Sequence, residues 1–196
     1  MNYTLTRLHG DVMARLGEPA APQPQCGYLQ PASEAISLKI SAALAAEGSR
    51  LISSAAASRL GDAVTYPAEA EWKTMPCGLK GARLRLPPDF LRLVAVRAEG
   101  WTRAATRLVE PDNPEWERLW SAEPGIAGCA ERPMAYLMAD GGSPSLMAMG
   151  CSEEEAGGEV ELRIWRVPAA DADGTFEFPA ALYADLVASL AETVTS

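Results

Sequence analysis

The sequence contains almost no histidine: His9 is the only one among 196 residues. Histidine is the usual general base at neutral pH and a frequent zinc ligand. With a single histidine, the chain cannot form a histidine-rich metal site, and a Ser-His or Cys-His nucleophile pair could use only His9. His9 lies beside the apolar stripe of a predicted helix, where an ordinary helical residue is the favoured interpretation. We expect no catalytic residue, no cofactor and no metal site.

The four cysteines lack the spacing of a metal site. Cys26, Cys77, Cys129 and Cys151 form no C-x-x-C pair, so ordinary thiols are favoured over zinc ligands. No apolar run approaches the roughly 18 residues of a membrane span. Residues 1–10 lack the apolar core of a signal peptide. We expect a protein made and kept in the reducing cytoplasm, away from membranes.

Motifs that bind nucleotides or calcium are also missing. No glycine-rich phosphate loop and no nucleophile elbow is found. Residues 171–174 read DADG, like the start of a calcium loop, but the twelfth position is Leu182 where such a loop needs glutamate. The acidic run at residues 153–155 is typical of a solvated loop. For residues 171–174 a plain turn is therefore favoured over a calcium site, and for residues 153–155 a solvated loop is favoured over a cation site.

Positive charge is scarce and unevenly placed. The chain has 17 Lys+Arg against 26 Asp+Glu, a net charge of −9. Residues 1–66 have net charge 0, residues 67–110 have +3 and residues 111–196 have −12. A negative chain repels phosphate groups, so we expect no tight or specific nucleic-acid binding. The asymmetry suits contact between unlike patches of neighbouring subunits, and a solvated acidic surface is the alternative.

Helical spacing of apolar residues predicts two N-terminal helices. The first covers residues 3–16, and a Pro/Ala linker follows over residues 18–25. The second is alanine-rich and covers residues 33–62, and Gly48 is expected to bend or split it. The alanines permit close helix packing, which is favoured within the chain over packing between subunits.

The middle of the chain changes to the patterns of β-strands. About six strands are expected, at residues 83–86, 90–98, 106–110, 133–138, 145–150 and 159–167. An Asn113-Pro114 start predicts one short helix near 113–121. Helical spacing predicts a last helix from residue 179 onward. Because helices and strands are segregated along the chain, the expected fold class is α+β.

The predicted segments are helical (1–66), antiparallel and β-rich (67–178) and helical again (179–196), with the last helix packing back onto a single domain. Trp116 and Trp120 are four residues apart and are expected to share a helix face. They either cap the β core, which is favoured, or form a hot-spot pair in an interface. We also expect the terminal helix to be a docking element, and its candidate interface residues are Leu182, Tyr183 and Leu186.

Residues 86–101 read LPPDFLRLVAVRAEGW. This proline-led strand with a Gly-Trp turn resembles head–tail connector proteins of tailed phages and prophages, which are adaptor or head-completion proteins. The helix start at Pro114, the strand start at Pro133 and the last helix also fit, so the resemblance extends over residues 30–195. The alanine content and the linker prolines, Pro22 and Pro24, depart from the family pattern.

The resemblance implies a structural role without catalysis or cofactor. Copies would form a ring beneath the portal protein, bind tail components on the other side and line the channel for the genome. An acidic channel wall suits DNA that must slide. Such a protein is made in the cytoplasm and ends in the virion if it is phage-derived.

Two alternatives remain beside the connector. One is a non-catalytic accessory or binding module of another bacterial complex. The other is an enzyme, which would need a concave pocket holding acids such as Glu131, Asp140 and Glu159 with raised pKa values.

Overall fold

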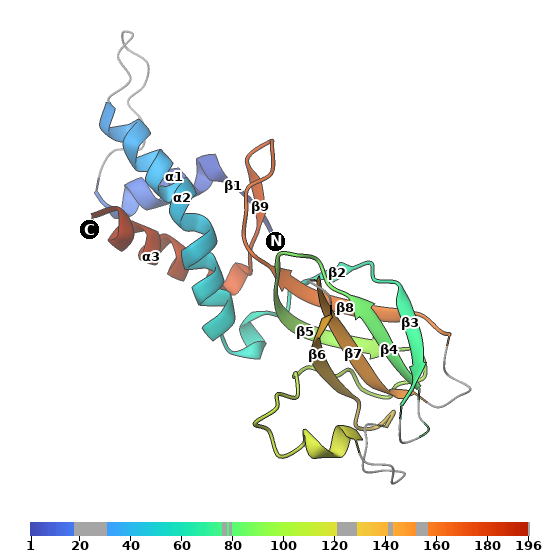
Figure 1. Cartoon of the computed structure of the whole chain (residues 1–196). Helices are drawn as coiled ribbons and strands as arrows, with labels where there is room; N and C mark the ends of the chain where they lie inside the picture. The colour runs from blue at the N-terminus through green and yellow to red at the C-terminus, as the bar shows by residue number, and fades with distance from the viewer. Residues whose placement is uncertain are drawn as a thin grey trace. The chain divides into compact units, whose positions relative to one another are not determined.

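The computed structural model divides the chain into two compact units (Figure 1). Unit 1 comprises Met1–Asp62 and Val167–Ser196, and unit 2 comprises Ala63–Arg166. The first and last parts of the chain therefore belong to the same unit. The structure describes residues 1–17, 31–75, 78, 80–120, 129–140, 143–151 and 157–195, without the side chains of 31–34, 119, 120, 139, 140, 143 and 151.

The fold is α+β, as the segregated sequence patterns predict. Three α-helices and nine strands lie within the described ranges, and every pair of strands is antiparallel. N-terminal helices, a β-rich middle and a C-terminal helix follow in that order, which confirms the predicted class. None of the described helices is both long and apolar enough to cross a membrane.

Unit 1 consists of three helices and a two-stranded sheet. The α-helices are α1 (Leu5–Arg15), α2 (Pro31–Ser54) and α3 (Tyr183–Thr195). Strands β1 (Asn2–Thr4) and β9 (Thr175–Glu177) pair with each other. Two 3-10 turns are η1 (Ala57–Arg59) and η3 (Ala180–Leu182). The last helix thus begins as a 3-10 turn and becomes an α-helix only at Tyr183.

Apolar side chains from these elements form the core of unit 1. The residues with at most 2% of their surface exposed include Leu8, Ile40, Leu44, Ile52, Phe176, Phe178, Leu186 and Leu190. Each large apolar side chain buried in this way contributes about 1.5–3 kcal/mol. Figure 1 shows α2 and α3 side by side, with α1 next to them.

Gly48 does not split α2, which runs unbroken from Pro31 to Ser54. A Cβ added at Gly48 would lie 2.8 Å from Pro168 Cγ and 3.2 Å from Phe178 Cε2. The glycine therefore lets the segment before and after β9 approach the helix closely. The predicted split is wrong because this packing offsets the helix propensity that one glycine loses, about 1 kcal/mol.

Helix α2 ends at Ser54, earlier than the predicted residue 62. The Ser54 hydroxyl donates to the carbonyl of Arg50 at 2.9 Å and to that of Leu51 at 3.3 Å. A hydroxyl that occupies carbonyls of the last turn competes with continued helix formation. The chain then passes through η1 to Asp62, whose carboxylate accepts from the Ala180 N–H at 3.0 Å.

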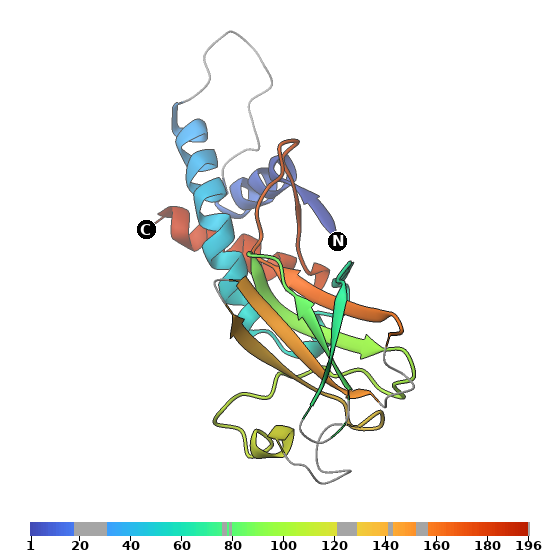
Figure 2. The same ribbon diagram turned by 45° about the vertical axis from the view of Figure 1, so that its right-hand side comes forward.

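Unit 2 contains seven strands in two antiparallel sheets (Figure 2). The first sheet has the order β2-β8-β5 and the second β3-β4-β7-β6. Their bounds are β2 (Val64–Tyr66), β3 (Ala70–Thr74), β4 (Lys80–Arg85), β5 (Phe90–Ala98), β6 (Met134–Asp140), β7 (Ser143–Cys151) and β8 (Val160–Arg166). Buried side chains from both sheets meet in one apolar cluster that includes Leu84, Leu86, Val96, Trp101, Leu146, Leu162 and Ile164.

Residues 106–110 do not form the predicted partner strand of β5. Strand β8 takes that place, and the segment after β5 makes only single bridges, Val96 with Ala105 and Leu108 with Ala135. Its buried residues, Trp101, Ala105 and Val109, recur every four positions. A half-buried strand instead buries every second residue, which explains why this segment is a loop packed on the sheets.

Replacing Gly48 with alanine tests the close approach in unit 1. We expect Gly48→Ala to lower the free energy of unfolding by about 1–3 kcal/mol, because the new methyl group overpacks the contact with Pro168. Gly10→Ala is the matched control: Gly10 lies within α1 with nothing inside 4 Å of an added Cβ. It should stabilise the unit by about 0.5–1 kcal/mol. Urea denaturation followed by far-UV circular dichroism measures both, and stabilisation by both would contradict the close contact.

Candidate functional site

The five predicted interface residues fall into both units. Leu182, Tyr183 and Leu186 belong to unit 1, whereas Trp116 and Trp120 belong to unit 2. The backbone of Trp120 ends the 3-10 turn η2 (Glu117–Trp120), and its side chain lies outside the described residues. The predicted residues therefore form two separate sets.

The helix predicted near 113–121 is a turn followed by one 3-10 turn. Asn113 acts as expected: its side-chain oxygen accepts from the Glu115 N–H at 2.8 Å, and its carbonyl accepts from the Trp116 N–H at 2.8 Å. Regular 3-10 structure begins only at Glu117, so Trp116 precedes it. The four-residue spacing to Trp120 therefore does not define a shared α-helical face, because no α-helix spans both residues.

Trp116 packs on a methionine-rich cluster in unit 2. Its ring meets the ring of Tyr136 edge-on, with centroids 5.6 Å apart and an interplanar angle of 80°. The buried members of the cluster are Met75, Val109, Tyr136, Met147 and Met149. Burial raises the pKa of the Tyr136 hydroxyl. Because edge-to-face aromatic pairs and sulfur contacts both stabilise such packing, the geometry favours the core interpretation of Trp116.

Leu182 and Leu186 are core residues of unit 1. Leu182 is 1% exposed and Leu186 is 0% exposed. A side chain with no exposed surface cannot contact a partner unless its helix leaves the core. Among the described residues of unit 1, Leu38 of α2 is the most exposed large apolar side chain, at 72% exposure.

Tyr183 joins β1, α1 and α3 through one cluster of aromatic and charged groups. Its ring stacks on Tyr3 with centroids 4.1 Å apart, and its hydroxyl donates to Asp11 Oδ2 at 2.8 Å. The Arg7 guanidinium lies 5.4 Å from both ring centroids. Burial, reinforced by Asp11, raises the pKa of Tyr183. Sequence reasoning missed Tyr3, Arg7 and Asp11, although the i,i+4 spacing of the arginine and the carboxylate was an available signal.

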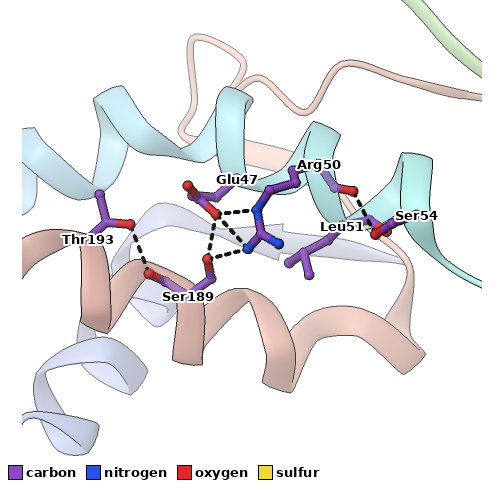
Figure 3. Close-up of polar contacts among 6 residues, drawn as sticks. All are labelled: Glu47, Arg50, Leu51, Ser54, Ser189 and Thr193. Atoms are coloured by element: carbon purple, nitrogen blue, oxygen red, sulfur yellow. Dashed lines mark hydrogen bonds and ion pairs between the residues drawn. The ribbon is translucent and has the colours of Figure 1, made fainter.

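A second polar cluster links α2 to α3 (Figure 3). The Arg50 guanidinium donates to Glu47 Oε2 at 2.8 Å and to the Ser189 hydroxyl oxygen at 2.9 Å. The Ser189 hydroxyl also donates to Glu47. These hydrogen bonds, from Ser189 first and then Arg50, lower the pKa of Glu47. The cluster is a helix–helix link between α2 and α3.

An open groove of about 1540 Å³ lies in unit 2. It is lined by the end of β2 and the start of β3, by residues 97–100 at the end of β5 and by residues 157–161 at the start of β8. Two half-buried aromatic side chains, Tyr66 and Trp72, form part of its wall. Sequence reasoning missed both, since a single tryptophan in a short strand has no periodic signal.

The groove carries more negative than positive charge. Four exposed carboxylates line it, from Glu69, Glu99, Glu159 and Glu161, together with one exposed guanidinium from Arg97. A Cβ added at Gly158 would lie 2.5 Å from Glu99 Oε2 and 2.8 Å from Glu99 Cβ. The side chain of Glu99 thus lies directly over Gly158, which places one carboxylate beside the residues that precede β8.

Of the acids considered for an enzyme, Glu159 lines the groove of unit 2 and Glu131 is not among its lining residues. Glu131 is exposed on the turn between Cys129 and Arg132. The side chain of Asp140 lies outside the described residues. Within the described part of the chain, no group of three or more His, Cys, Asp or Glu side chains could hold a metal ion.

The DADG segment folds as a turn closed by its own hydrogen bonds. The Asp173 carboxylate accepts from the Thr175 hydroxyl at 2.7 Å and from the Thr175 N–H at 3.1 Å. Both bonds lower the pKa of Asp173. The carboxylate therefore closes an Asx turn, which agrees with the favoured interpretation of this segment.

Neither the family models nor the curated proteins include a significant match to this chain. The resemblance of residues 86–101 to phage connectors thus stays a prediction.

Leu186→Asp distinguishes a core residue from a docking residue. We expect it to lower the free energy of unfolding of unit 1 by about 3 kcal/mol or more, because it places a charge in the apolar core. Leu38→Asp, at an exposed position of the same unit, should change stability by less than about 0.5 kcal/mol. Thermal denaturation followed by circular dichroism measures both. A stable, folded Leu186→Asp protein would contradict the core assignment.

Ser189→Ala tests the α2–α3 link through its pH dependence. We expect it to lower the free energy of unfolding by about 1 kcal/mol at pH 7. Because the pKa of Glu47 is lowered from 4.5 in the folded protein, this stabilisation is present above the unfolded pKa and is lost as the pH falls through the folded pKa. Urea denaturation across a pH series measures the difference between variant and parent.

Thr193→Ala is the control for this pH series. The Thr193 hydroxyl donates to the Ser189 carbonyl at 2.9 Å and makes no contact with the Glu47 carboxylate in the cluster (Figure 3). Its effect on stability should therefore not change with pH. A pH-independent effect of Ser189→Ala as well would show that the hydroxyl does not act through Glu47.

Proposed function

We propose that the chain is a structural subunit of a phage or prophage head–tail connector ring. In this role it docks on the portal protein, contacts tail components and lines the genome channel. The observation that carries the proposal concerns residues 86–101, the segment that resembles connectors: it contains β5, and its buried side chains belong to the core cluster of unit 2. Such a subunit is made in the cytoplasm and resides in the virion.

Both ends of this segment are held by specific contacts. Asp89 accepts from the Arg166 guanidinium at 2.7–3.0 Å, which ties the start of β5 to the end of β8. Gly100 turns the chain with φ of +82°, a conformation that glycine adopts without strain. Trp101 then enters the core at 1% exposure. The distinctive residues of the segment are therefore those that a rigid β unit requires.

Unlike charges on one unit support a ring. The groove of unit 2 is acidic, whereas Arg103 and Arg107, on the loop after β5, are exposed basic residues. Subunits of a ring contact one another heterologously, each through two different patches. Opposite charges on the two patches favour the head-to-tail arrangement and disfavour like-to-like pairing.

The overall charge supports a channel through which DNA slides. A net charge of −9 repels phosphate groups. A channel wall that binds DNA tightly would retain the genome, so an acidic or neutral wall fits this role. The acidic groove also fits the second candidate, a non-catalytic binding module of another bacterial complex.

Assembly with the portal protein of the same phage or prophage tests the proposal. We expect native mass spectrometry and electron microscopy of the two proteins together to show a ring on the portal. A chain that stays monomeric and ignores the portal would overturn the connector role. A stable small oligomer whose gene has no phage structural genes beside it would favour the binding module instead.

Charge reversal refines this test. Arg103→Glu with Arg107→Glu should weaken ring assembly by about tenfold at low salt, because exposed charges act over a Debye length of about 10 Å at 0.1 M salt. The matched control reverses two other exposed arginines, Arg15 and Arg118. Equal effects of the two pairs would show that only total charge matters.

A further inference from the structure

Strand β2 is shorter than the strand it pairs with. Val64 pairs with Ile164 and Tyr66 with Leu162, and the pairing stops there. On its other side, β8 continues to pair with β5, through Glu161 with Arg97 and then Val160 with Ala98. Within the described part of the chain, the first residues of β8 thus have a neighbouring strand on one side only.

Pro67 explains why β2 stops. Proline has no backbone N–H and cannot donate the next bond of a ladder. The chain instead turns through Ala68 and Glu69 into β3, which is an edge strand of the second sheet. Among the described residues, no strand therefore occupies the position beside the start of β8.

The open position coincides with the groove of unit 2. Pro67, Ala68 and Val160 line it, together with the aromatic side chains of Tyr66 and Trp72. An extended segment placed there would continue the line of β2 and have an apolar wall on one side. Addition of a strand to an exposed sheet edge is a common mode of peptide recognition, in which backbone hydrogen bonds supply the affinity.

The charges of the groove specify the occupant. Glu159 and Glu161 are two residues apart, so in extended backbone they project to the same face. Glu99 directly follows β5 and its side chain packs over Gly158, and Glu69 lines the groove just before β3. Opposite charges on directly facing positions of adjacent strands stabilise pairing. A strand with basic side chains at alternate positions complements this edge.

We propose that this edge of β8 binds an extended basic segment of a partner protein. The segment adds as a strand beside residues 159–161, places its arginine or lysine side chains against the groove carboxylates and its alternate apolar side chains toward Trp72. This inference goes beyond the connector role, because it applies to any assembly in which the chain takes part.

A designed peptide tests the inference on the full chain. The probe is a short fluorescein-labelled peptide of alternating arginine and valine, and its binding is followed by fluorescence anisotropy. We expect saturable binding that weakens as salt is added, and no binding of the same peptide with glutamate in place of arginine. Absence of saturable binding, or equal binding of the acidic peptide, would overturn the proposal.

A matched pair of variants locates the site. Glu159→Gln with Glu161→Gln should weaken peptide binding by about tenfold, since each close charge pair contributes a few-fold. Glu115→Gln with Glu117→Gln, which removes two exposed charges elsewhere in unit 2, should leave binding unchanged. Circular dichroism shows whether both variants retain the fold. Equal weakening by both pairs would mean that the peptide senses net charge alone.

A backbone-modified peptide separates strand addition from simple charge attraction and needs no protein variant. Methylation of the backbone nitrogen at alternate residues removes the N–H donors of one strand edge and keeps every charge. We expect the methylated peptide to bind at least about tenfold more weakly. Equal affinity of the two peptides would overturn strand addition. Self-association of the chain that persists when the peptide is added would also overturn it.

Discussion

Burial of apolar side chains between the two sheets is the constraint on which unit 2 depends. Leu84 and Leu146 come from one sheet and Val96 and Leu162 from the other, and all four have no exposed surface. Trp101 closes the same cluster from the loop after β5. Because the sheets share this core, the ends of their strands are fixed relative to one another. The groove is a consequence: it forms where β2 leaves one sheet and β3 joins the other.

Unit 1 is organised differently, around helices whose contacts combine an apolar core with polar links. Leu186 and its neighbours provide the free energy of burial, whereas the hydroxyls of Tyr183 and Ser189 bind carboxylates on α1 and α2. Apolar burial has no preferred direction. Hydrogen bonds at the border of the core have a preferred direction. These two hydrogen bonds therefore select the register in which α3 lies against the other helices.

The sequence patterns predicted the long elements and missed the short ones. Strand β8 alternates over several residues, and β5 is a nine-residue apolar run rich in Val and Leu, so both signals are visible in the sequence. Strands β1 and β9 have three residues each, and three residues carry no period. Helical spacing correctly marked Leu186 as part of an apolar face, but spacing alone does not tell whether such a face meets a partner or the chain itself. The groove was not predicted because it depends on the register between β2 and β8, which no local pattern encodes.

The order of the two units along the chain has a consequence for synthesis. Helices α1 and α2 leave the ribosome early, but α3, which completes their core, follows only after the whole of unit 2. Unit 1 must therefore close a loop of about 100 residues, at an entropic cost that grows only slowly with length. Unit 2 is formed by one continuous chain segment, so it can fold before α3 has been synthesised. During that interval the apolar face of α2 is open to chaperones, and early folding of unit 2 shortens the effective loop that α3 has to span.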